Sequence, residues 1–130
     1  MGKIPEGELV AHRILIVDDE PNIVISLEYL LKKEGFEVKV ATDGDAALLQ
    51  AAEFRPHLML LDVMMPKKSG FEVCESLRAD PAMADLKIIM LTAKGRETEV
   101  TKGLALGANA YITKPFSTKD LVVQIKTLLA

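Results

Sequence analysis

Three aspartates stand where apolar runs of the sequence end. Asp62 ends the run Leu58–Leu61, and Asp18 and Asp19 directly follow Ile14–Val17. Short, wholly apolar runs are typical of strands buried on both faces of a parallel sheet, and the carboxyl ends of such strands meet along one edge. Three carboxylates gathered at one edge repel one another unless a hard cation such as Mg²⁺ lies among them.

A threonine and a lysine add the groups that a phosphoryl unit requires. Thr92 follows the apolar run Ile88–Leu91, and Lys114 follows Ala110–Thr113, so we expect both at the same edge. An ammonium group and a hydroxyl suit phosphoryl oxygens, and Mg²⁺ in proteins often binds carboxylates together with phosphate. A carboxylate is also a competent nucleophile. The set predicts phosphoryl transfer in which Asp62 carries the transferred group.

The elements that must position these residues alternate along the chain between strand and helix patterns. Pro21 suits the first position of a helix, and Gly35 supplies the residue that ends it. Ser69 and Glu72 match a capping box at another helix start, and Ser117 is expected to cap the last helix. The expected strands are Ile14–Val17, Phe36–Val40, Leu58–Leu61, Ile88–Leu91 and Ala110–Thr113. This alternation predicts an α/β fold with a five-stranded parallel sheet that helices cover on both faces.

The helix between the fourth and fifth expected strands has the weakest apolar pattern. Val100 and Leu104 are four residues apart, which predicts that both face the core, and Gly107 is expected to end the helix.

Composition excludes several classes of function. The chain has 130 residues, a net charge of −3 and 49% hydrophobic residues, as expected for one globular domain without the basic surface of a nucleic-acid-binding protein. No apolar run reaches the roughly 20 residues that span a bilayer, and the first residues lack the apolar core of a signal peptide. The single cysteine, Cys74, suits a reducing compartment. A cytoplasmic protein is the simplest expectation.

Four short motifs occur in order at the ends of the expected strands. They are Val17–Glu20, Asp62 followed by Met65, Pro66 and Gly70, then Leu91–Ala93, and Tyr111–Phe116. With these motifs the chain resembles the receiver domain of two-component response regulators, from Arg13 to Ala130. The resemblance implies a doubly wound, flavodoxin-like sheet of order 2-1-3-4-5 and a cis peptide bond before Pro115. Residues 1–12 precede this domain and are expected to form a mobile leader.

The resemblance also implies a metal site. Mg²⁺, or Mn²⁺ in its place, would be bound by the Asp19 and Asp62 carboxylates and by the backbone carbonyl of Met64. Asp18 would act mainly through a metal-bound water.

The same resemblance implies a regulatory switch rather than a metabolic enzyme. Asp62 would accept a phosphoryl group from a histidine kinase or a histidine phosphotransfer protein, and Lys114 and Thr92 would contact that group. Thr92 and Tyr111 would transmit the change to a downstream effector that binds the fourth helix, fifth strand and fifth helix. No nucleic acid or membrane is expected to bind this domain.

Three other functions fit parts of the pattern. A phosphohydrolase with an aspartate nucleophile, of the haloacid-dehalogenase type, places a second aspartate two residues after the nucleophile, but Met64 stands there. A flavodoxin-like nucleotide or flavin binder needs a first loop rich in Gly, Ser or Thr, whereas this loop is Asp18–Pro21. A degenerate receiver that never carries phosphate is disfavoured because the whole acceptor set is present.

Met64 and Lys94 are further expected to govern how long a phosphoryl group lasts. In receivers, the residues at these two positions flank the approach of the hydrolysing water. A methionine is at best a weak hydrogen-bond acceptor and a charged lysine accepts no proton, so the phosphoryl group is expected to be comparatively long-lived.

Overall fold

The computed structural model describes residues 11–93 and 95–130, and within them a five-stranded parallel sheet. The strand order is β2-β1-β3-β4-β5, as the resemblance implied. The strands are β1 (Arg13–Val17), β2 (Glu37–Ala41), β3 (Leu58–Asp62), β4 (Lys87–Ala93) and β5 (Ala110–Lys114). The central strands are buried on both faces, whereas β2 at one edge alternates between exposed and partly buried residues.

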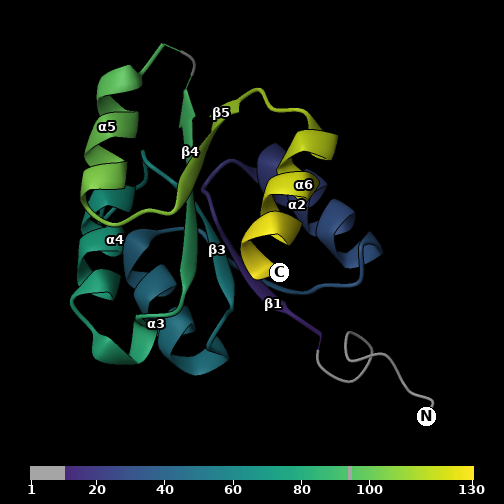
Figure 1. Ribbon diagram of the computed structural model, residues 1–130, viewed down its shortest axis with the longest axis horizontal. Helices are drawn as coiled ribbons and strands as arrows, with labels where there is room; N and C mark the ends of the chain where they lie inside the picture. The colour runs from purple at the N-terminus through teal and green to yellow at the C-terminus, as the bar shows by residue number, and fades with distance from the viewer. Residues whose placement is uncertain (1–10, 94) are drawn as a thin grey trace.

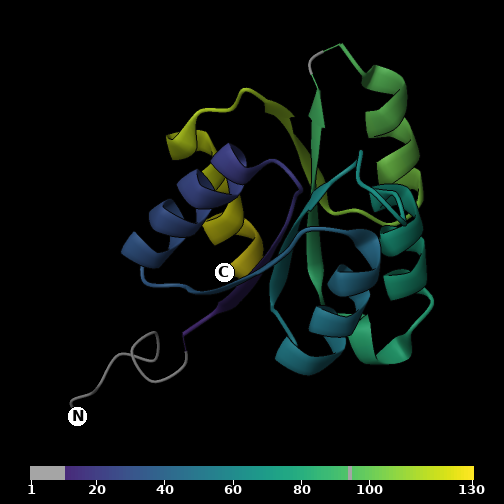
Figure 2. The same cartoon turned by 180° about the vertical axis from the view of Figure 1, so that it is seen from behind.

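Helices cover both faces of the sheet (Figures 1 and 2). On one face lie α2 (Pro21–Lys33) and α6 (Thr118–Leu129). On the other lie α3 (Gly44–Phe54), α4 (Gly70–Arg78) and α5 (Glu97–Ala105), with a short 3₁₀ turn, η1 (Pro81–Met83), after α4. The predicted doubly wound α/β fold is therefore confirmed.

The helix starts follow the capping signals of the sequence. Pro21 stands at the first position of α2, and Ser69 and Glu72 form a complete capping box on α4. The Ser117 hydroxyl accepts a hydrogen bond from the backbone N–H of Asp120 at the start of α6. Caps of this kind satisfy N–H groups that the helix itself leaves without acceptors.

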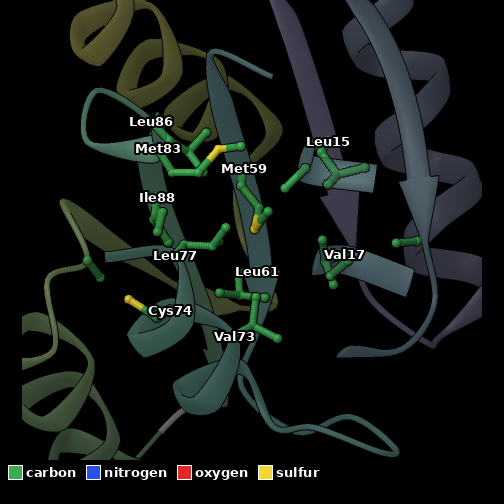
Figure 3. Close-up of a cluster of buried hydrophobic side chains, with 14 of the residues drawn as sticks. Leu15, Val17, Met59, Leu61, Val73, Cys74, Leu77, Met83, Leu86 and Ile88 are labelled. Atoms are coloured by element: carbon green, nitrogen blue, oxygen red, sulfur yellow. The ribbon is translucent and has the colours of Figure 1, made fainter. Parts of the chain in front are cut away.

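Two apolar clusters, one on each face, hold the sheet. Figure 3 shows the larger one, in which Leu15, Val17, Met59 and Leu61 of the sheet belong to one cluster with Cys74 and other residues of α4. Burying a side chain such as Leu61 contributes about 1.5–3 kcal/mol. Because these strands are packed on both sides up to their last residues, their carboxyl ends are held in place.

The prediction that Leu104 of α5 faces the core is wrong. Val100 is partly buried as expected, but the Leu104 side chain is 42% exposed and Gly103 is the buried residue. A Cβ atom at Gly103 would lie 3.2 Å from the Met90 side chain, so α5 approaches β4 closely at this residue. Glycine carries no apolar side chain, so a search for apolar spacing misses this contact.

Arg78 ties the end of α4 to the turn between α5 and β5. Its Nε atom donates to the Gly107 carbonyl oxygen at 2.9 Å, and Nη2 donates to Asn109 Oδ1 at 2.8 Å. The same Asn109 oxygen accepts from the backbone N–H of Ile88, the second residue of β4. These bonds fasten the carboxyl end of α5 to the body of the protein.

From the sequence we also expected a mobile leader and no stretch long enough to span a membrane. The expected leader falls mostly on residues 1–10, which lie outside the described part of the chain, so it stays a prediction. Among the described residues, no helix has both the length and the apolar character needed to cross a membrane.

Gly70→Ala is expected to destabilise the protein by about 1–3 kcal/mol, as overpacking commonly does. A Cβ atom there would overlap the Asp62 carbonyl oxygen and come within 2.9 Å of the Val63 Cα atom, and neither backbone group can move freely. Urea unfolding measures the loss. The matched control is Gly103→Ala, whose added methyl group meets the flexible Met90 side chain and gains helix propensity. An equal loss in both variants would contradict the prediction.

Candidate functional site

The predicted site residues meet at the carboxyl edge of the sheet. Asp62 is the last residue of β3 and Lys114 the last of β5, while Thr92 lies near the end of β4 and Asp18 directly follows β1. The register pairs Asp62 with Leu91, and Thr92 with Thr113 one residue before Lys114. A cavity of about 170 Å³ opens between these strand ends. Parallel pairing therefore gathers residues that are far apart in the sequence.

The three aspartates form one acidic cluster. Each of Asp18, Asp19 and Asp62 offers a carboxylate oxygen, and these oxygens all lie within 4.8 Å of one another. Asp18 is fully buried and Asp62 nearly so, while Asp19 is exposed. Burial, and next the charge of Asp18, raise the pKa of Asp62 to about 6, although Lys114 acts in the opposite direction. The site thus holds negative charge at a cost in free energy.

Lys114 supplies the positive charge that faces this cluster. Its Nζ atom lies 2.8 Å from Asp18 Oδ2, 2.8 Å from Glu20 Oε1 and 3.6 Å from Asp62 Oδ1. Burial alone would lower the pKa of Lys114, but the close Asp18 carboxylate, the hydrogen bond to Glu20 and the charge of Asp62 outweigh it and raise the pKa above its ordinary value. Lys114 is therefore a firmly charged ammonium shared among three carboxylates.

Glu20 is a site residue that the sequence analysis missed. It accepts a hydrogen bond from Lys114 across 94 positions of the chain. The sequence offered a signal, because Glu20 follows Asp19 in a run of three acids, but a carboxylate before Pro21 is also explained by the start of a helix.

Two buried oxygen atoms at the site lack hydrogen-bond partners among the described residues. They are Asp18 Oδ2, which is close to Lys114 Nζ but not in hydrogen-bond geometry, and Thr92 Oγ1. Buried polar atoms without partners are rare and costly. Water bound to Mg²⁺ would serve the first, and a phosphoryl oxygen would serve the second. The atoms that could bind a metal here are oxygens, and most of them belong to negatively charged carboxylates. Such a set of ligands fits a hard divalent cation.

Met64 lines the cavity, whereas Tyr111 lies outside it. Met64 lines the cavity and is 64% exposed, and its backbone N–H approaches Asp62 Oδ1 at a long 3.4 Å. Tyr111, on β5 opposite Met90, is half-exposed and lines a separate groove with Leu104. The structure brings Met64 into the site and places Tyr111 outside it.

Three further expectations can be compared with this geometry. The peptide bond between Lys114 and Pro115 is cis, as the resemblance implied. Lys94 lies outside the described residues, so its expected role stays a prediction. Met64 has no group that moves a proton, so the cavity lacks an acid at the position where a haloacid-dehalogenase-type hydrolase needs one.

Comparison with known proteins agrees with this geometry. A family model for the response regulator receiver domain matches residues 14–126. Over 117 residues the chain is 46% identical to the alkaline phosphatase synthesis transcriptional regulatory protein PhoP of Bacillus subtilis. It is 45% identical, again over 117 residues, to the phosphate regulon transcriptional regulatory protein PhoB of Rhizobium meliloti. These alignments cover 90% of this chain but 48% and 52% of the relatives, so the chain spans about half their length.

A solved structure is similar over most of the chain. The chemotaxis response regulator CheY4 of Vibrio cholerae superposes with a TM-score of 0.86 at 30% identity, covering 92% of this chain and 99% of that one.

Asp62→Asn is expected to stabilise the protein by about 1–3 kcal/mol near neutral pH in magnesium-free buffer. The pKa of Asp62 is about 6 in the folded state, above the ordinary value of 3.8, so the folded state binds more protons between these values. Stability is therefore lost as pH rises toward 6, and the asparagine removes that loss.

Urea unfolding at a series of pH values measures this effect. The gain should disappear below the ordinary aspartate pKa, and Asp85→Asn, an exposed change at the opposite edge of the sheet, should give no comparable gain. A gain that did not depend on pH would contradict the explanation.

Proposed function

This chain belongs to the response regulator receiver domain family, and on that premise we propose that it accepts a phosphoryl group on Asp62 as a signalling switch. The observation that carries the proposal is the buried Asp62 carboxylate, with two further aspartates beside it and Lys114 opposite. We propose a regulatory domain rather than an enzyme with a diffusing product.

In the proposed reaction, a carboxylate oxygen of Asp62 attacks the phosphorus atom of the donor. The new oxygen–phosphorus bond forms as the donor's nitrogen–phosphorus bond breaks, and the donor nitrogen keeps the electron pair. Lys114 balances charge on the transferred group, and the Thr92 hydroxyl, which has no partner among the described residues, donates to one of its oxygens. The chain's own contribution is therefore positioning and charge.

The metal site proposed here consists of Asp19, Asp62 and the Met64 carbonyl, with Asp18 acting through a bound water. Mg²⁺ bound there would neutralise charge on the carboxylates and the phosphoryl oxygens, and Mn²⁺ would be able to replace it. The acidic cluster of Asp18, Asp19 and Asp62 supports this assignment.

The proposed partners follow from the family. A histidine kinase or histidine phosphotransfer protein would donate the phosphoryl group in the cytoplasm, and a downstream effector would bind the face formed by α5, β5 and α6. With a net charge of −3, this domain is not proposed to bind nucleic acid itself. An aspartate-nucleophile phosphohydrolase remains the alternative, and Met64 disfavours it.

Acetyl phosphate with Mg²⁺ should add the mass of one phosphoryl group to the protein, because Asp62 is the buried acceptor. Asp62→Asn should abolish the gain, chelation of Mg²⁺ should prevent it, and Asp85→Asn should leave it intact. Lys114→Ala should bind metal largely as the wild type does but be phosphorylated more slowly. Intact mass spectrometry checks each result, and the same modified site forming without magnesium would contradict the proposal.

Phosphorylation is expected to shift amide resonances of α5, β5 and α6 as well as those of the loops around Asp62. The Thr92 hydroxyl would move toward the phosphoryl group and leave space that the Tyr111 ring can fill, which shifts the population between two packings. In Thr92→Ala the shifts should remain near Asp62. Distant shifts of equal size in both proteins would show that Thr92 does not transmit the change.

The phosphoryl group is expected to hydrolyse slowly, because neither Met64 nor Lys94 can orient an attacking water as an acid or amide does. Met64→Asn, alone and together with Lys94→Glu, should accelerate loss of the phosphoryl group from purified protein in Mg²⁺. The decay of the added mass with time measures this. If the wild type already decays as fast as the double variant, the explanation is wrong.

A further inference from the structure

Arg96 and Glu99 line the same cavity as Asp62 and Thr92, although the sequence analysis assigned neither to the site. Arg96 is the residue directly before α5, and its side chain does not cap that helix. Glu99 lies in the first turn of α5. The start of α5 therefore brings one cation and one carboxylate to the cavity.

The ion pair between these two residues is loose. Arg96 Nη1 and Glu99 Oε2 are 3.7 Å apart, which is longer than a hydrogen bond, and the Arg96 side chain is 52% exposed. Ion pairs of this kind contribute little to stability. Within the described part of the chain, Arg96 makes no other side-chain hydrogen bond or ion pair, so its guanidinium can change partner at small cost.

Glu99 differs from Arg96 in burial. Its side chain is only 15% exposed, so its charge is held beside the cavity rather than in solvent. A carboxylate in this position attracts Arg96 and repels any further negative charge that enters the cavity.

A phosphoryl group on Asp62 changes the balance of charge in this cavity. Lys114 is already shared among Asp18, Glu20 and Asp62, so it is only partly available to the new group. Among the described residues that line the cavity, Arg96 is the second cation. A guanidinium presents several N–H donors in a planar fork that matches phosphoryl oxygens.

We propose that the Arg96 guanidinium binds the phosphoryl group on Asp62 by leaving Glu99. The inference rests on the proposed function and adds a residue that binds the phosphoryl group. In the resting protein Glu99 competes for Arg96, and in the phosphorylated protein Arg96 joins the phosphoryl oxygens to the start of α5. When Arg96 moves from Glu99 to the phosphoryl group, it acts directly on the start of α5, a helix of the proposed effector surface.

The test uses beryllofluoride with Mg²⁺ as the phosphoryl mimic and calorimetry to measure its binding to the full chain. Arg96→Gln should weaken binding roughly tenfold, because a charge-assisted hydrogen bond is lost. Arg96→Lys should fall between Arg96→Gln and wild type. Glu99→Gln should strengthen binding, since Arg96 no longer has a competing partner. Lys102→Gln, which removes a positive charge from α5 outside the cavity, should leave binding unchanged.

The double variant Arg96→Gln with Glu99→Gln separates two explanations. If Glu99 acts chiefly through Arg96, Glu99→Gln should strengthen binding far less in the Arg96→Gln background than in the wild type. If Glu99→Gln strengthens binding equally with and without Arg96, Glu99 acts by its own repulsion and the exchange is wrong. The proposal would also be overturned if Arg96→Gln bound the mimic as tightly as the wild type and had the same urea midpoint. Wild-type protein that neither binds beryllofluoride nor gains phosphoryl mass would instead overturn the proposed function.

Discussion

The buried pair of carboxylates at Asp18 and Asp62 is the constraint on which the site depends. Two such groups lie within a few ångströms of each other, and Lys114 provides one positive charge for both. In water the repulsion would be small, but burial strengthens it and raises the pKa of Asp62 to about 6. The proposed metal ion and phosphoryl group would each change this balance of charge.

The rest of the fold keeps this unfavourable arrangement from relaxing. The strands β1, β3 and β4, which lead to Asp18, Asp62 and Thr92, are packed on both faces up to these residues, and β3 is buried along its whole length. A carboxylate on a loop could turn toward solvent, whereas Asp62 at the end of β3 has no such freedom. The apolar clusters therefore supply the free energy that holds the charges together.

Much of the fold and of the site was predictable from the sequence, because the residues that could carry out chemistry lie at or next to the ends of strands. Continuous apolar runs marked β1, β3 and β4. The residues after the β3 and β4 runs, Asp62 and Thr92, line the cavity, and the buried Asp18 after the β1 run belongs to the acidic cluster beside it. The contacts of Glu20, Arg96 and Glu99 were not predictable in this way, because each acts through a partner that only folding brings near or through a helix start whose direction no pattern specifies. Leu104 was misplaced for a related reason: α5 packs through the backbone of Gly103, and apolar spacing records side chains only.

The bonds from Arg78 to Gly107 and Asn109 have a mechanical consequence for α5. They fix one end of a nine-residue helix, while its other end begins at the cavity, where Arg96 has a weak partner. A rod held at one end responds to a pull at the other by turning about the fixed point. We therefore expect a change at the cavity to swing α5 as a lever with its pivot near Gly107. The largest displacement would then occur at the cavity beside Asp62, and the smallest next to Gly107.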